Sequence, residues 1–172
     1  ASRFSSAFGL CADAAMTTLG SDLKMRELIS ARLGDVLANL YMISMVLKNW
    51  NETQPVEGER ALVEYSLSYL LNRIETALEE FFQNLPNRPV AWALKAITMP
   101  LGRNWDRPHD DVSRALARAI STDTPLREKL LRPAWTTTEE GGVDNPIAQY
   151  NDLLKHYERA EGLYRKVGKA YA

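Results

Sequence analysis

Residues 85–103 read LPNRPVAWALKAITMPLGR, and they hold a short, almost wholly apolar helical pattern between two proline-containing stops. Asn87 is a good helix N-cap, and Pro89 suits a first turn because the N–H that proline lacks would be unpaired there. Pro100 and Gly102 end the pattern. The residues therefore predict a helix over 89–99. A bilayer span needs about 20 residues, so we expect this helix to be buried against protein.

The segments that precede this stretch repeat apolar residues at helical spacing. They predict long helices over residues 3–19, 23–50 and 59–85, with Gly20 in a left-handed conformation at the end of the first and Ser21 or Asp22 as the cap of the second. The three apolar stripes are Phe4, Phe8, Cys11, Ala15 and Leu19; Leu33, Val36, Leu37, Leu40, Ile43, Leu47 and Trp50; and Leu67, Leu70, Leu71, Ile74, Leu78, Phe81, Phe82 and Leu85.

In two of these helices, the residues outside the main apolar stripe also indicate how the helix is buried. Met42 and Met45 add apolar groups outside the main stripe of the second helix, which is typical of a helix at the centre of a bundle. Glu64, Glu75 and Glu79 should mark the solvent-facing side of the third helix.

The segments that follow 85–103 are shorter. Asp106 and Pro108 indicate another helix start, and Thr124-Pro125 opens a short helix that runs to Leu131. Residues 133–145 have loop composition. Asn145-Pro146 opens the last long helix, whose apolar stripe is Leu153, Tyr157, Ala160, Tyr164, Val167 and Tyr171.

No segment alternates apolar and polar residues with period two, so the predicted fold class is all-α. We expect a helical bundle of about four long helices plus two or three short ones, with no sheet. The length of 172 residues suits a single α-helical domain over 1–172. Its long-helix part would be 1–86, and its short helices and closing long helix would lie in 87–172.

Composition excludes several classes of protein. The net charge of −1 gives no global field that would attract nucleic acid or an anionic membrane. Cys11 is the only cysteine, so no internal disulfide can form, which fits a reducing, cytoplasmic location. No apolar run is long enough for a transmembrane helix. Because helical periodicity is already present at Phe4, we expect the chain to be a fragment of a longer polypeptide.

Charge is unevenly distributed along the chain. Residues 51–86 carry two basic and seven acidic residues, and residues 87–133 carry nine basic and five acidic ones. These neighbouring segments either complement each other or leave the basic segment facing an anionic ligand. The basic residues of interest are Arg88, Arg103, Arg107, Arg114 and Arg118. Nucleic-acid binding would require stacking aromatic residues interleaved with them, and that pattern is absent.

No catalytic constellation is evident from spacing. His109 and His156 lie far apart in sequence, and His156 has only one carboxylate, Asp152, at helical spacing, which is not a ligand cluster, so we expect surface histidines and no metal site. Cys11 lies on an apolar stripe, which favours a buried structural thiol. The acid pairs Glu79-Glu80 and Glu139-Glu140 point in different directions on a helix. Gly141-Gly142 lacks the strand-turn-helix context of a phosphate loop.

Three sets of residues resemble one family, and they follow the family's order along the chain. The first comprises Leu85-Pro86-Asn87-Arg88, the apolar helix, Pro100-x-Gly102-Arg103, and Pro108 followed by acids. The second comprises Asp13-Ala14-Ala15-Met16, Leu19-Gly20, Leu23-Lys24 and Ser30-Ala31-Arg32-Leu33-Gly34-Asp35, and the third is Asn145-Pro146. In these features the chain resembles the C-terminal all-α domain of the large bacterial acyl-CoA dehydrogenases of fatty-acid β-oxidation.

The resemblance implies a function for the full-length enzyme. Such an enzyme binds FAD and oxidises acyl-CoA to trans-2-enoyl-CoA, with a glutamate that takes the α-proton and a flavin that takes the β-hydrogen as hydride. These groups lie in core domains upstream, so the resemblance implies no catalytic, cofactor-binding or metal residue here, and no FAD bound to this segment alone. It implies that the partners are that upstream core of the same polypeptide and, through the enzyme, acyl-CoA. A homodimer and a location peripheral to the inner membrane are further expectations.

Within that role, the helix 89–99 would be the docking or core element. Arg88 and Arg103 at its ends would anchor it on the catalytic core or contact CoA phosphates. The alternatives are a free-standing helical protein-interaction module without enzymatic activity, and a helical regulator that binds acyl-CoA without catalysis.

Overall fold

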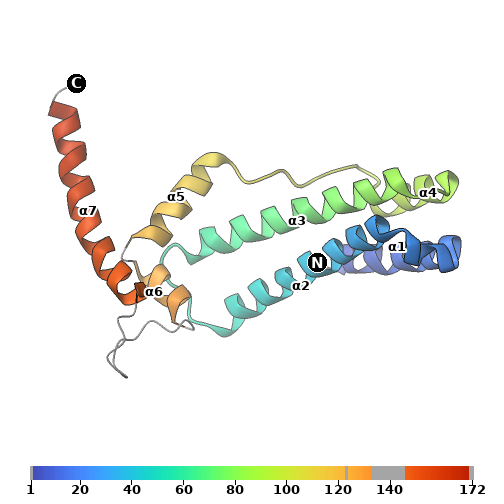
Figure 1. The fold of residues 1–172 in the computed structure, drawn as a ribbon, viewed down its shortest axis with the longest axis horizontal. Helices are drawn as coiled ribbons and strands as arrows, with labels where there is room; N and C mark the ends of the chain where they lie inside the picture. Colours follow the sequence, from blue (N-terminus) through green and yellow to red (C-terminus); the bar gives the residue numbers. More distant parts are fainter. Residues whose placement is uncertain (1, 123, 133–145, 171–172) are drawn as a thin grey trace. The chain divides into compact units, whose positions relative to one another are not determined.

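The structure, a computed structural model, describes residues 2–122, 124–132 and 146–170. Within these ranges the chain forms α-helices and one 3-10 helix and no strand, which confirms the all-α fold class (Figure 1). Of the α-helices in these ranges, four are long and three are short, as predicted. The elements are α1 (Ser2–Leu19), η1 (Gly20–Met25), α2 (Glu27–Glu52), α3 (Glu59–Asn84), α4 (Arg88–Thr98), α5 (Asp110–Ser121), α6 (Pro125–Leu131) and α7 (Pro146–Ala170).

The chain divides into two compact units. The first comprises residues 1–54 and 62–109, and the second comprises residues 55–61 and 110–172. The single domain expected over residues 1–172 therefore stays a prediction.

The first unit holds the main hydrophobic core. Its buried side chains come from one stripe on each of α1, α2 and α3 and from the inner face of α4. Burying apolar side chains of this size stabilises a fold by about 1.5–3 kcal/mol each relative to leaving them exposed. The fully or almost fully buried members include Cys11, Val36, Ile43, Ile74, Leu78, Phe81 and Leu85.

In the first unit, α4 ends in a turn after which the chain runs back along α3 as an extended segment, residues 102–109 (Figure 1). Gly102 has a φ of 72°, and its N–H donates to the carbonyl of Met99. That left-handed conformation is easily adopted only by glycine, which explains the predicted stop. Because 102–109 is extended, α5 begins at Asp110, later than the start predicted from Asp106 and Pro108.

The second unit is organised around the start of α3 and α6. Both carboxylate oxygens of Glu59 accept hydrogen bonds from Lys129 Nζ, at 2.6 and 2.7 Å, and Glu59 Oε2 also accepts from the Val56 N–H. Leu126 is buried beside Gly58, whose φ is 80°. The predicted Thr124-Pro125 helix start is confirmed, since the Thr124 hydroxyl accepts from the Arg127 N–H.

The structure corrects four expectations about helix faces and starts. Neither Ser21 nor Asp22 caps the second helix, because Gly20 (φ 52°) leads into the 3-10 turn and α2 starts after Arg26 without a side-chain cap. Glu75 does not face solvent, because it is fully buried.

The other two corrections concern exposed apolar faces. Helix α2 is not buried all round, since Leu37, Met42 and Met45 are exposed. Helix α4 is buried on one face only, as described below. The loop predicted at 133–145 lies outside the described residues.

Candidate docking surface

Helix α4 begins and ends as its sequence predicts. The Asn87 side chain accepts a hydrogen bond from the Val90 N–H at 3.3 Å, and Pro89 lies in the first turn. At the other end, the Met99 N–H donates to the Lys95 carbonyl, and Arg3 of α1 donates to the carbonyl of Thr98 at 3.0 Å. Both ends are therefore tied to their surroundings by hydrogen bonds.

The inner face of α4 belongs to the core. Ala91, Leu94 and Thr98 are buried, and Met99 follows them at the turn. Lys95 Nζ reaches Glu79 Oε1 of α3 at 3.2 Å, an ion pair that is partly exposed and so contributes little stability. Helix 89–99 was predicted to be either a docking element or a core element, and this inner face of α4 makes it a core element.

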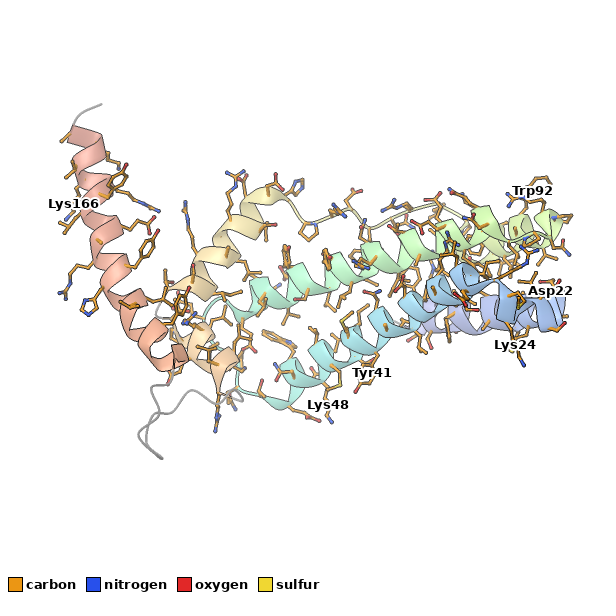
Figure 2. The ribbon with its side chains drawn as sticks, in the orientation of Figure 1. Asp22, Lys24, Tyr41, Lys48, Trp92 and Lys166 are labelled. Carbon is orange, nitrogen blue, oxygen red and sulfur yellow. The ribbon has the colours of Figure 1, made fainter. Side chains whose placement is uncertain are left out.

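The outer face of α4 is apolar and exposed. Trp92, Ile97 and Leu101 are 65, 68 and 82% exposed, and Trp92 projects outward from the helix (Figure 2). Small apolar residues and prolines between them are also exposed. We call this surface the outer α4 face; it comprises Pro89, Trp92, Ala93, Ala96, Ile97, Pro100 and Leu101. Contiguous exposed apolar surfaces of this kind mark interaction sites.

Arg88, at the start of α4, has a local structural contact. Its Nη1 donates to the carbonyls of Phe82, Gln83 and Leu85, at 3.0, 2.8 and 3.4 Å. These carbonyls lie at the C-terminal end of α3, where a cation also interacts favourably with the helix dipole. The guanidinium therefore closes the α3–α4 turn, and its proposed contact with a core domain or with CoA remains a prediction.

Arg103 has a different environment. Its side chain is exposed, and it has no ion pair or hydrogen bond with any residue in the described ranges. It lies at the start of the extended segment, just beyond the outer α4 face. Of the two arginines predicted as anchors, Arg103 is the one available to a partner or an anionic group.

A buried pair on α3 holds the segment that carries Arg103. Glu75 Oε2 accepts hydrogen bonds from the N–H groups of Asn104 and Trp105, at 2.9 and 3.0 Å, and Asn72 Nδ2 donates to the Trp105 carbonyl at 2.7 Å. We call this arrangement the Asn72–Glu75 clamp. Sequence reasoning missed it, although Glu75 lies one turn from both Leu71 and Leu78 and so falls on the apolar stripe.

Helix α2 carries a second exposed apolar surface in the same unit. Leu37 and Tyr41 are 53 and 65% exposed, and Tyr41 points away from the core (Figure 2). Met42 and Met45 lie beside them and are also exposed. Methionine adapts its shape to different contacts, so this stripe also suits an interaction surface.

The residues that could act in catalysis or bind a metal do not converge on a site. Cys11 is fully buried, as predicted, and burial raises the pKa of its thiol to about 12, which leaves it protonated and unreactive at neutral pH. Glu79 and Glu80 pair separately, with Lys95 and with Arg32. His109 and His156 are exposed, and no three His, Cys, Asp or Glu side chains in the described part of the chain could hold a metal ion.

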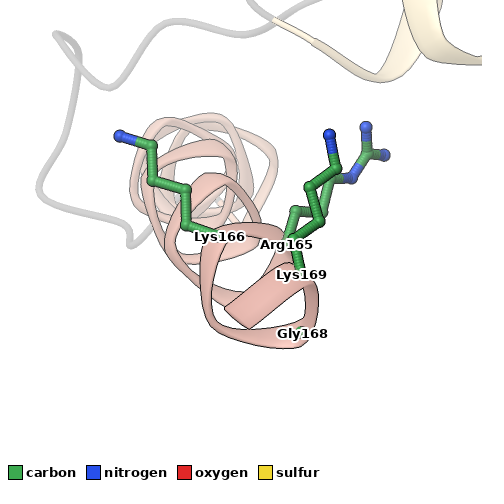
Figure 3. A pocket seen from close by; sticks show the side chains of 4 residues that line it. All are labelled: Arg165, Lys166, Gly168 and Lys169. Atoms are coloured by element: carbon green, nitrogen blue, oxygen red, sulfur yellow. The ribbon is translucent and has the colours of Figure 1, made fainter. Parts of the chain in front are cut away.

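A hollow of about 390 Å³ lies on α7, lined by Arg165, Lys166, Gly168 and Lys169. Arg165 and Lys169 project to one side of the helix and Lys166 to another, so the three cations do not converge (Figure 3). A flavin requires a concave, largely apolar pocket with a few convergent polar groups. This hollow does not fit a flavin, and no chemical step is assigned to it. Glu139-Glu140 and Gly141-Gly142 lie outside the described residues.

The comparison with known families identifies the chain over its whole length. No solved structure shows a significant match. The family model described as "Acyl-CoA dehydrogenase, C-terminal, bacterial type" matches residues 1–172. The outer α4 face and Arg103 thus lie within a region that this model covers. The chain belongs to the bacterial-type C-terminal domain family of the acyl-CoA dehydrogenases.

Proposed function

We propose that the chain is the C-terminal structural and substrate-shaping domain of an FAD-dependent acyl-CoA dehydrogenase of fatty-acid β-oxidation. An upstream catalytic core of the same polypeptide binds the flavin and carries the glutamate base. That core oxidises acyl-CoA to trans-2-enoyl-CoA, and this domain packs on it beside the acyl tunnel. The family membership supports the assignment to an acyl-CoA dehydrogenase.

The outer α4 face is the observation that carries the docking role. An exposed tryptophan and two exposed aliphatic residues form an apolar centre, and Arg103 lies at its edge. Interfaces are typically organised in this way, with aromatic and aliphatic anchors inside a polar rim. We propose that this face contacts the catalytic core and that Arg103, with Arg88 in a lesser role, contacts the core or the CoA phosphates.

The decisive experiment uses the full-length enzyme. Replacing Trp92 and Ile97 together by glutamine should remove the apolar anchors without disturbing the core of this unit. We expect faster hydrogen exchange over 86–101 and weaker retention of FAD during dilution. The matched control is the Leu37→Gln/Tyr41→Gln pair on the exposed stripe of α2, which should change neither reading.

Two outcomes would contradict the proposal. Protection of α4 that is the same in the full-length enzyme and in the separate 172-residue chain would show that the core does not cover this face. Flavin absorbance and dehydrogenase turnover from the 172 residues alone would show that the chemistry lies in this chain.

The exposed stripe of α2 supports a second candidate function, that of a helical interaction module without enzymatic activity. The sequence translated immediately before Ala1 distinguishes the two functions, since a dehydrogenase core there supports the first. An acyl-CoA-binding regulator would release or absorb heat when the isolated chain is titrated with long-chain acyl-CoA.

The cytoplasmic location, peripheral to the inner membrane, remains part of the proposal. Among the described residues, no helix combines the length and the apolar character that crossing a bilayer requires.

A further inference from the structure

The methionines of this chain have an unusual distribution. Methionine is among the residues most often fully buried in folded proteins. Of the five methionines in the sequence, only Met99 is buried, with an exposed fraction of 3%. The other four lie in α1, η1 and α2, and their exposed fractions are 85% for Met25, 55% for Met16, 47% for Met45 and 44% for Met42. The first unit therefore presents most of its methionine sulfur to solvent.

Packing does not explain the four exposed methionines. None of them is a member of the hydrophobic core or of the half-buried residues that pack against it, whereas Met99 is a core member. Leucine forms helices about as readily as methionine and would supply a similar apolar surface at these positions. Methionine differs from leucine in its thioether sulfur, which is polarizable and can be oxidised.

The thioether reacts with hydrogen peroxide without the help of a cofactor. The sulfur lone pair attacks one peroxide oxygen, and the O–O bond breaks as the S–O bond forms. The leaving hydroxide takes the proton of the transferred oxygen and becomes water. Sulfur loses the two electrons that the peroxide gains, so one methionine and one peroxide give one methionine sulfoxide and one water. The product is a polar side chain in place of a flexible apolar one.

The only thiol of the chain does not compete for peroxide. Cys11 is fully buried, and burial raises the pKa of its thiol to about 12. The thiolate, which is the reactive form, is therefore absent at neutral pH. The exposed methionines are the sulfur groups that peroxide reaches first.

Two of these methionines lie in the exposed stripe of α2. Met42 and Met45 are three residues apart, so they are neighbours on the helix surface, and Leu37 and Tyr41 lie beside them. Two sulfoxides at these positions place two strong hydrogen-bond acceptors in a stripe that is otherwise apolar. Because the core does not use either side chain, their oxidation should leave α2 folded.

We propose that hydrogen peroxide oxidises the four exposed methionines of the first unit, and that the sulfoxides of Met42 and Met45 turn the α2 stripe from an apolar into a polar surface without unfolding the chain. The stripe is thus a redox-sensitive surface, which becomes apolar again when methionine sulfoxide reductases restore the thioether. The proposal is independent of the docking role of α4, because the outer α4 face contains no methionine.

The first test follows the order of oxidation in the folded wild-type chain. Samples of a peroxide time course are digested, and mass spectrometry measures the sulfoxide at each methionine. We expect Met25 to react first, and Met99 at least about tenfold more slowly than any of the other four, because its sulfur is reached only when the core opens. In concentrated urea all five should react at similar rates, which is the control for intrinsic reactivity.

The second test measures the polarity of the stripe by hydrophobic interaction chromatography. Met16→Leu/Met25→Leu leaves the α2 pair as the only exposed methionines, and peroxide should shift this variant to earlier elution. Treatment with the two methionine sulfoxide reductases, one for each sulfoxide epimer, should reverse the shift. The matched control also carries Met42→Leu/Met45→Leu, and its elution should not change with peroxide. The midpoint of urea unfolding should be the same before and after oxidation of the α2 pair.

The other outcomes overturn the proposal. Oxidation of Met99 as fast as that of Met42 in the folded chain would show that exposure does not select the sites. Unchanged elution of the oxidised double variant, or an equal shift in the control, would show that the two sulfoxides do not alter the stripe. A lower urea midpoint would show that the fold depends on these side chains. The first test needs no variant, and a failure of the α4 experiment in the full-length enzyme leaves both tests unaffected.

Discussion

The two oxygens of one buried carboxylate have different surroundings. Glu75 Oε2 accepts two backbone N–H groups, while Glu75 Oε1 has no hydrogen-bond partner among the described residues. Burying an acceptor without a hydrogen-bond partner costs desolvation free energy, and the two N–H hydrogen bonds to the other oxygen offset that cost. Single residues in this chain therefore act chiefly by joining segments: Glu75 holds the segment 102–109 on α3, and Arg88 closes the α3–α4 turn.

Removing the Glu75 side chain should release the segment that carries Arg103. Glu75→Ala removes the acceptor of two partly buried hydrogen bonds, from the N–H groups of Asn104 and Trp105, so we expect a loss of about 1–3 kcal/mol in the free energy of unfolding. Glu75→Gln keeps one acceptor oxygen and should lose less. Urea unfolding measures both, and hydrogen exchange at the amides of Asn104 and Trp105 shows where protection is lost.

The control is Gln83→Ala at an exposed position of the same helix, which should change the free energy of unfolding by less than about 0.5 kcal/mol. Unchanged exchange at Asn104 and Trp105 in Glu75→Ala would contradict the clamp.

The two arginines at the ends of α4 should differ in their effect on stability, because Arg88 makes structural hydrogen bonds and Arg103 is free to contact a partner. Arg88→Ala removes the cation that binds three carbonyls, and we expect the free energy of unfolding to fall by about 1 kcal/mol. Arg103→Ala should change it by less than about 0.5 kcal/mol. Thermal unfolding of the isolated chain makes the comparison, and equal effects of the two substitutions would refute the distinction.

At the scale of elements, α4 combines two interfaces in one short helix. Its inner face contributes Ala91 and Leu94 to the core, and its outer face exposes Trp92 and Ile97. A helix that is apolar all round is usually buried all round. The exposed half of α4 is therefore the feature that most strongly indicates a missing partner in the first unit.

The two faces should respond differently to substitution. Leu94→Ala creates a cavity in the core and should lower the free energy of unfolding by about 2–4 kcal/mol. Trp92→Gln and Ile97→Gln change exposed side chains, and each should change it by less than about 1 kcal/mol. Urea unfolding of the isolated chain tests this. A large loss from Ile97→Gln would mean that the outer face is already covered by this chain.

At the scale of the whole molecule, the first unit is held by an apolar core and the second depends on an ion pair. Burial alone would raise the pKa of the Glu59 carboxyl, but hydrogen bonds from Lys129 and the Val56 N–H, together with the Lys129 charge, outweigh burial and lower that pKa below its ordinary value of 4.5. A paired carboxylate of this kind makes stability depend on pH.

The pH dependence has a definite sign. Because the folded pKa of Glu59 is lowered, its contribution is complete above the unfolded pKa near 4.5 and is lost as pH falls through the folded value. Glu59→Gln should lower the free energy of unfolding at pH 7 by about 1–3 kcal/mol and flatten the fall of that free energy as the pH drops below the unfolded pKa near 4.5. Circular dichroism melts across this range provide the measurement.

Glu161→Gln is the control for this experiment, because it removes an exposed pair with Arg165 that contributes little. Parallel pH curves for wild type and Glu59→Gln would show that the Lys129 pair does not control acid stability.

Local residue chemistry is the reason so much of the fold could be predicted. Helical periodicity, the Asn87 and Thr124 caps, and the stops at Gly20 and Gly102 each act within a few residues, so they determine the number of helices and most of their ends without tertiary contacts; the starts of α2 and α5 differ from the prediction. The family membership also follows from sequence, since it depends on the order of residue types along the chain.

Tertiary structure decided which faces of those helices are covered. Periodicity shows that Leu37 and Trp92 are apolar, but only the arrangement of the other helices leaves them exposed. The same holds for Glu75, whose burial depends on a segment about 30 residues further along the chain that supplies N–H donors. Helix formation is a local property of the sequence, whereas burial depends on contacts between distant segments, and the candidate docking surface is defined by burial.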